Sequence, residues 1–159
     1  MLRLIPAPLH RLALPIAHRV RHHWRGIVKT PLVGCNIVIS DLEGSVLLLR
    51  HSYGPKVWCL PGGGVGRRED PIDAARREVR EELQIKLESI KLVTELQETI
   101  SGSPHTTYLF AATTDQRPRA DRREILEARF FPRHSLPQPQ GDRTQARLDA
   151  WRAATKGRS

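Results

Sequence analysis

Residues 62–85 read GGGVGRREDPIDAARREVREELQI and place a glycine turn, a helix start and several carboxylates in one short segment. Glycine permits backbone angles and a close ligand approach that other residues do not allow. Glu69, Asp70 and Pro71 follow, and acidic residues and proline are favoured in the first turn of a helix. Apolar residues then recur at steps of three and four, at Ile72, Ala75, Val79 and Leu83. This periodicity predicts an amphipathic helix with one buried side.

The same helix carries a cluster of carboxylates, Glu78, Glu81 and Glu82, on a neighbouring side. Like charges at this spacing repel by roughly a few tenths of a kcal/mol in an isolated helix. One interpretation is a solvated helix face, since glutamate is a good helix former. The other is an oxygen-rich site for Mg²⁺ or Mn²⁺, which bind through carboxylates and substrate phosphates. The spacing alone does not choose between them.

The complete pattern resembles the Nudix box, G-x5-E-x7-R-E-U-x-E-E-x-G-U, in which U is an aliphatic residue. It begins at Gly63, continues through Glu69 and Arg77, and ends at Ile85. Every defined position matches except Gln84, where the family has glycine. Further similarity to Nudix domains extends over roughly residues 32–137, carried by LLLR at 47–50, WCLPGG at 58–63 and EILEARFF at 124–131.

The resemblance implies a metal-dependent hydrolase that cleaves a diphosphate linkage in a nucleoside diphosphate joined to another group, such as a nucleotide, a nucleotide sugar or a (d)NTP. By position it assigns catalysis and the binding of Mg²⁺ or Mn²⁺ to Glu78, Glu81 and Glu82, with the carbonyl of Gly62 as a further metal ligand. It assigns the bracing of the loop against the helix to Gly63, Glu69 and Arg77. The chemistry is consistent, because a divalent cation neutralises an anionic diphosphate, orients the leaving group and lowers the pKa of bound water.

Departures from the family pattern leave a second hypothesis open. Gln84 stands where a helix commonly ends in a left-handed residue, which should cost about 1 kcal/mol unless the helix ends differently. Gly66 and Arg68 stand where many relatives have glutamate and glycine, so the loop is more basic. The alternative function is therefore a non-catalytic Nudix-fold module that binds a nucleotide or a partner. The intact carboxylates favour the enzyme.

Four positions outside the box are further candidates. Arg50 could contact phosphate, or it could be a surface arginine. Tyr53 could stack on a base, or it could pack at a rim. Nudix relatives often place another acid near Glu124 and Glu127, where it binds metal or takes a proton from water. Catalysis requires a base within hydrogen-bond reach of that water, and the sequence does not identify which glutamate serves.

The remaining elements are expected from runs of β-branched and aliphatic residues. These runs predict strands at 33–40, 45–50, 57–60, 90–100, 105–113 and 128–131. Turns at 41–44 and 101–104 join two hairpins, and a final helix is predicted at 142–154. With the Nudix resemblance, this order predicts an α/β/α sandwich with a mixed β-sheet, forming one Nudix domain over residues 31–155 with a tail at 156–159.

Residues 1–30 predict a basic amphipathic helical extension. They contain six Lys or Arg and no acid, and one apolar stripe formed by Leu9, Leu12, Ile16, Val20 and Trp24. We expect this helix to pack on the domain or on a second subunit, or to lie on an anionic membrane surface. It lacks the continuous apolar core of a signal peptide, and no segment is apolar enough to span a membrane.

Charge and cysteine content bound the partners. Lys and Arg outnumber Asp and Glu by 26 to 17, which gives a net charge of +9 and suits anionic partners. Because much of the excess lies near the two ends, we expect a small nucleotide substrate and no stable nucleic-acid partner. Cys35 and Cys59 lie in apolar runs and are predicted to be buried free thiols. We expect a cytoplasmic protein.

Overall fold

The structure is a computed structural model that describes residues 32–100, 102–120, 122 and 124–156. The predicted helical extension over residues 1–30 therefore lies outside the described residues, as does the tail beyond residue 156. Of the helices that the structure describes, none is long and apolar enough to cross a membrane.

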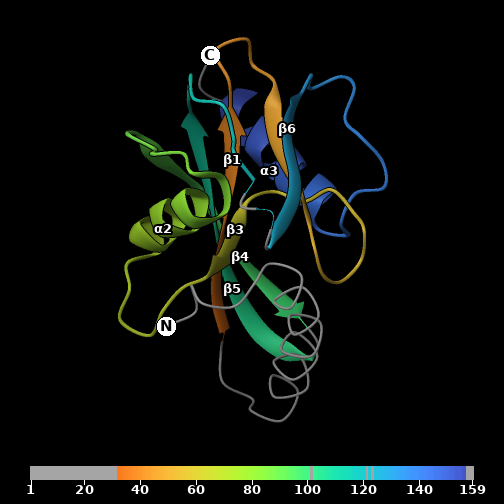
Figure 1. Cartoon of the computed structure of the whole chain (residues 1–159). Helices are drawn as coiled ribbons and strands as arrows, with labels where there is room; N and C mark the ends of the chain where they lie inside the picture. Colours follow the sequence, from red (N-terminus) through yellow and green to blue (C-terminus); the bar gives the residue numbers. More distant parts are fainter. Residues whose placement is uncertain (1–31, 101, 121, 123, 157–159) are drawn as a thin grey trace, which may run out of the picture.

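A single mixed sheet organises the described part of the chain (Figure 1). Its strands are β1 (Leu32–Ser40), β2 (Val46–His51), β3 (Gly62–Gly64), β4 (Ile90–Ile100), β5 (Ser103–Thr113) and β6 (Ile125–Phe131). Their order is β4-β5-β1-β2-β6, and β3 pairs with β1 off this path. The central pair β1 and β5 is parallel, whereas the other pairs are antiparallel. The mixed sheet predicted from the sequence is confirmed.

Two helices cover the two faces of this sheet, α2 (Pro71–Leu83) and α3 (Thr144–Lys156). Because side chains alternate along a strand, β1 sends Ile37 and Ile39 to one face and Val38 to the other. The first face packs against α2, and the second packs against α3 through residues such as Leu148 and Trp151. Figure 1 shows the helices on opposite sides of the sheet. The α/β/α sandwich is therefore confirmed.

The predicted hairpins form, with small changes in their limits. In the turn after β1, Oδ1 of Asp41 accepts hydrogen bonds from the backbone N–H groups of Glu43 at 3.0 Å and Ser45 at 2.7 Å. Gly44 follows in the left-handed region at φ 84°. The second turn is tighter than predicted, because β5 already begins at Ser103 and pairs with Ile100 of β4.

The predicted strand at 57–60 is wrong. Trp58 and Cys59 make only isolated bridges, to Gln140 and to Leu49 respectively. The strand forms instead at Gly62–Gly64, where the chain pairs with β1. An apolar residue can be buried without belonging to a strand. Trp58 is an example, because it packs against α3 outside any β-ladder. Both cysteines are free, with Cys35 buried and Cys59 half-buried.

The end of α2 provides a test of backbone strain. Gln84 adopts the left-handed conformation at φ 58° and ψ 27°, and its N–H donates to the carbonyl of Arg80 at 3.1 Å. Since a side chain disfavours this conformation, Gln84→Gly should raise the free energy of unfolding by about 1 kcal/mol. Urea denaturation measures this change. Gln84→Ala serves as the control, because it keeps the Cβ atom and should bring no comparable gain.

Candidate active site

Pairing with the central strand fixes the glycine turn. In β3, residues Gly62, Gly63 and Gly64 lie opposite Asn36, Cys35 and Gly34 of β1. A Cβ atom on Gly62, whose φ is 150°, would lie 2.1 Å from the carbonyl oxygen of Cys35. Such a contact is impossible without moving the backbone. Glycine therefore allows β3 to lie directly against the centre of the sheet.

Capping sets the start and direction of the box helix. Asp70 is the N-cap of α2, and its Oδ1 accepts a hydrogen bond from the N–H of Ile72 at 2.9 Å. Pro71 begins the helix, as expected for a residue that needs no intrahelical donor. Val79 and Leu83 are fully buried against the sheet. This packing fixes the rotation of α2 and turns the carboxylate side toward β3.

The carboxylates of the box line one cavity of about 460 Å³, together with Gly62–Gly64. Gly63 approaches Glu78 so closely that a Cβ atom would lie 2.4 Å from the carboxylate Oε1. Glu82 is only 7% exposed, and its Oε2 accepts a hydrogen bond from the N–H of Gly62 at 3.4 Å. Glu81 is exposed at the edge of the same cavity. The carboxylates and the glycine strand thus face a shared space.

An arginine on α2 ties the loop to the helix. Arg77 donates from Nε to Oε1 of Glu69 at 2.8 Å and from Nη2 to Oε2 at 3.0 Å. The same Nη2 donates to the carbonyl of Gly64 at 3.1 Å. Oε2 of Glu69 also accepts from the N–H of Gly66 at 2.9 Å. The structure thus brings Glu69 and Arg77 together with the glycine loop. The family resemblance predicted that these residues hold the loop against the helix.

This ion pair predicts a pH dependence of stability. Hydrogen bonds from Arg77 and from the N–H of Gly66 lower the pKa of Glu69 from 4.5 to about 2. Since the folded pKa lies below the unfolded one, the stabilisation is complete above pH 4.5 and is lost as the pH falls toward 2. Glu69→Gln should be less stable than wild type at neutral pH and should lose less further stability across that window.

Unfolding curves at a series of pH values test this expectation. Glu98 and Glu127, whose pKa values are also lowered, are present in both proteins and cancel in the comparison. If the two proteins lost stability in parallel between pH 4.5 and 2, Glu69 would not be the titrating group.

The donor atoms of the cavity suit a hard divalent cation. Burial raises the pKa of Glu78, Arg77 opposes this shift by a hydrogen bond, and the charges of Glu81 and Glu124 add to it. A bound cation would favour the ionised carboxylate. The candidate ligands are all oxygens, from Glu78, Glu81, Glu82 and the carbonyl of Gly62, as Mg²⁺ and Mn²⁺ prefer.

The described residues alone do not enclose a cation. Among them, no three His, Cys, Asp or Glu side chains are grouped closely enough to hold a metal ion by themselves. Oε1 of Glu78 instead accepts a hydrogen bond from Nη1 of Arg77 at 2.8 Å. A ligand set completed by the phosphates of a substrate is compatible with this arrangement.

The further candidates fall into two groups. Tyr53 and Glu124 line the carboxylate cavity. Arg50 does not line it, because its Nη2 lies 2.6 Å from Oε2 of Glu127 and its guanidinium lies 4.9 Å from the centre of the Trp58 ring. Alternation along β2 places Arg50 on the face of α3 and the next residue on the face of α2. The structure thus separates Arg50 and Glu127 from the box carboxylates.

The sequence reasoning missed His51 and Cys59 as cavity residues. Both line the space above the box carboxylates, and the ring centre of His51 lies 5.1 Å from that of Tyr53. The predicted strand at 45–50 stopped one residue short, because His51 ends β2 in the structure. Extending the alternation of β2 by one residue beyond Arg50 would have placed His51 on the same face as the box helix.

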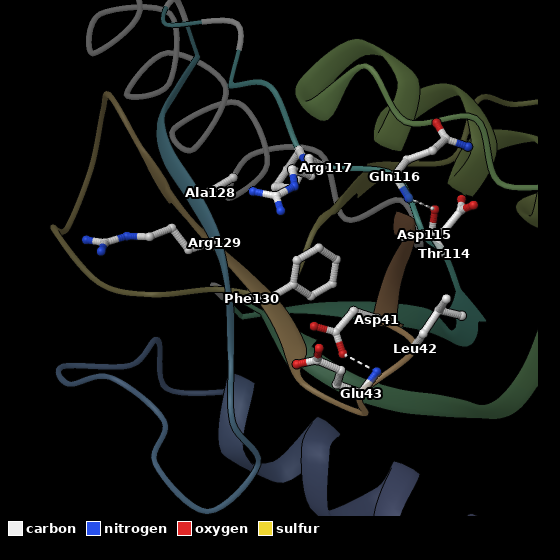
Figure 2. Close-up of a pocket in the computed structure, with 11 residues that line it drawn as sticks. Asp41, Leu42, Glu43, Thr114, Asp115, Gln116, Arg117, Ala128, Arg129 and Phe130 are labelled. Carbon is white, nitrogen blue, oxygen red and sulfur yellow. Dashed lines mark hydrogen bonds between the residues drawn. The ribbon is translucent and has the colours of Figure 1, made fainter.

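A separate cavity of about 590 Å³ lies between the β1–β2 turn, residues 114–118 and β6 (Figure 2). Some of its polar groups already serve the local structure. Oδ1 of Asp41 accepts from the N–H of Glu43, and Oγ1 of Thr114 accepts from the N–H of Gln116 at 3.1 Å. Arg129 forms an ion pair with Glu127. No box residue lines this cavity among the described residues, so we assign the site to the carboxylate cavity.

A family model and two curated relatives match parts of this chain. The family model of the NUDIX domain matches residues 30–152. An RNA pyrophosphohydrolase of Bartonella bacilliformis is 38% identical over 41% of this chain and 42% of its own length. Diphosphoinositol polyphosphate phosphohydrolase 3-alpha of Mus musculus is 35% identical over 52% of this chain and 49% of its own length.

A solved structure extends the similarity to most of the fold. The MutT NUDIX hydrolase from Burkholderia pseudomallei is 29% identical, with a TM-score of 0.69 over 76% of this chain and 98% of that chain. The chain spans less than half the length of the two relatives above. Because the family model matches most of the chain and includes the whole box, this chain belongs to the Nudix family.

Proposed function

We propose that this chain is a Mg²⁺- or Mn²⁺-dependent hydrolase that cleaves a diphosphate linkage in a nucleoside diphosphate joined to another group. The observation that carries the proposal is the shared cavity of Glu78, Glu81 and Glu82 beside β3. A pure binding site does not require three mutually repelling carboxylates on one helix. Two relatives named as a pyrophosphohydrolase and a phosphohydrolase support the same class of reaction.

The residues of the chain have distinct roles in this proposal. Glu78 and Glu82, which are half-buried and buried, would hold the cation together with the carbonyl of Gly62. When bound, such a cation neutralises the charge of the diphosphate and makes water a better nucleophile. Glu81 and Glu124 are exposed in the same cavity, so their carboxylate oxygens are accessible to take the proton of the attacking water.

The ion pair between Arg77 and Glu69 keeps the carboxylates and the glycine loop in position during the reaction. Two hydrogen bonds between Arg77 and Glu69 hold the glycine loop against α2. A fixed loop lets the carboxylates meet a diphosphate without reorganisation, and positioning supplies much of the rate in phosphoryl transfer.

A second candidate function is a module that binds a nucleotide without hydrolysing it. The hydrogen bond from Arg77 to Glu78 favours this alternative. It pairs one of the three carboxylates with a guanidinium group instead of leaving it for a metal ion. The basic Arg68 and the left-handed Gln84 are consistent with it.

A substrate panel separates the two functions. ADP-ribose, dNTPs, dinucleoside polyphosphates and capped or triphosphorylated RNA are incubated with the protein, with and without Mg²⁺. We expect metal-dependent release of a product from at least one of them. Saturable binding of a nucleotide without any product would favour the binding module instead.

A further inference from the structure

A second cavity adjoins the carboxylate cavity. It has a volume of about 1080 Å³, against about 460 Å³ for the first, and Gly63 and Gly64 line both. Its walls come from the start of β1, from β5 and from the loop before α2. The two cavities therefore meet at the glycine strand, and the second is the larger.

Two ring side chains from β5, those of His105 and Tyr108, line this second cavity from opposite faces of the sheet. A Cβ atom on Gly34 would lie 2.9 Å from Nε2 of His105, so glycine in β1 makes room for the imidazole. Tyr108 lies two residues from Phe110, with ring centres 6.5 Å apart and planes at 22°. A half-buried tyrosine held in this way offers a preformed surface for a planar group.

Among the described residues, the second cavity has one positive charge, that of Arg67, that no lining carboxylate balances. Among the described residues, Glu69 is the one carboxylate that lines it, and Arg77 neutralises that carboxylate. Arg67 also lines the cavity and is exposed. Within the part of the chain that the structure describes, Arg67 has neither an ion pair nor a hydrogen bond. Its guanidinium is available for an anion.

We propose that this second cavity binds the part of the substrate beyond the cleaved diphosphate, and that Arg67 selects substrates with at least one further phosphate. This inference rests on the proposed function. The planar guanidinium fork of arginine matches a phosphate, and Tyr108 can stack on a base attached to it. The preferred class is nucleoside polyphosphates, over molecules such as ADP-ribose that carry a neutral sugar beyond the diphosphate.

Neighbouring arginines provide a matched pair of variants. Arg67 and Arg68 are both exposed, but Arg68 does not line either cavity. Binding is measured in Mg²⁺ with a methylene-bridged, non-hydrolysable analogue of diadenosine tetraphosphate and with ADP-ribose. Arg67→Ala should weaken binding of the tetraphosphate analogue about tenfold and that of ADP-ribose less than about twofold. Arg68→Ala should change neither by more than about twofold.

Ionic strength gives an independent readout. Salt should weaken binding of the tetraphosphate analogue more steeply in the wild type than in Arg67→Ala, because one screened contact has been removed. Since Arg67 is exposed, its replacement leaves the folded core intact.

The outcomes separate this inference from the proposed function. Equal effects of Arg67→Ala and Arg68→Ala, equal weakening of both ligands, or no binding of the tetraphosphate analogue would overturn the role of Arg67. Hydrolysis of diadenosine tetraphosphate by the wild type is assayed in parallel. Binding that depends on Arg67 without any hydrolysis would refute the proposed activity while supporting this subsite.

Discussion

Glu82→Gln should lower metal-dependent hydrolysis by about a thousandfold or more, with little loss of folding. A carboxylate that holds a divalent cation supports several kcal/mol of transition-state stabilisation, and each 1.36 kcal/mol is roughly a factor of ten in rate. The amide keeps the size of the side chain and retains an oxygen that can accept from the N–H of Gly62. It binds a hard cation poorly because it carries no charge.

The measurement is kcat on the best substrate of the panel, with circular dichroism and urea unfolding as folding checks. Asp73→Asn is the matched control, because Asp73 is an exposed acid on α2 whose ion pair with Arg76 spans 3.4 Å. Exposed pairs of this kind contribute about 0–1 kcal/mol, so this control should keep its activity. Turnover of Glu82→Gln at the wild-type rate would remove the metal assignment.

The glycines of β3 should respond very differently to alanine, although they are adjacent. In Gly62→Ala the new Cβ atom meets the carbonyl oxygen of Cys35 at 2.1 Å, and the residue also has φ 150°. Because this oxygen belongs to the backbone of β1, the clash is relieved only if the two strands separate. We expect the free energy of unfolding to fall by about 3 kcal/mol or more.

Gly63→Ala should instead impair activity with a smaller effect on stability. Its Cβ atom would lie 2.4 Å from Cδ and Oε1 of Glu78, which are the far end of a side chain. The carboxylate can swing away, and the cavity then loses a ligand from its proposed position. We expect kcat to fall about a hundredfold, since small misplacements of catalytic groups have effects of this size.

Gly64→Ala is the control for folding in this series, because no atom of the described residues lies within 4 Å of its added Cβ. Its free energy of unfolding should stay within about 0.5 kcal/mol of wild type. The three variants are compared by urea denaturation, and the first two also by kcat. Equal losses of stability in all three variants would contradict this account, in which β3 is held by its pairing with Cys35 and Asn36.

Local features were predictable because the residues that form them are close in the chain. Asp70 caps α2 through a hydrogen bond two residues away, and Asp41 closes its turn through bonds to Glu43 and Ser45. The helical period of the apolar residues likewise depends on α2 alone. The left-handed end at Gln84 followed from the family pattern, in which glycine occupies that position.

Other features depend on contacts between distant segments. The pairing of β3 with β1 joins residues 62–64 to 34–36, and the composition of residues 57–60 predicted a strand in the wrong place. Alternation along β2 already places Arg50 and His51 on opposite faces of the sheet, but the residues of β6 that they pair with depend on strand register. A register shift in the pairing of β2 with β6 occurs between these same two residues. Spacing along the chain does not reveal such a shift.

The sequence by itself determined the family, the box helix and the identity of its carboxylates, because fixed gaps and helical periodicity are properties of a continuous segment. Only the tertiary structure decided that Tyr53 and Glu124 share the carboxylate cavity while Arg50 and Glu127 do not. It also decided that Arg67, and not Arg68, faces a second cavity beyond the glycines. The physical reason is that strand register and the packing of α2 against the sheet set which side of the backbone each of these residues occupies.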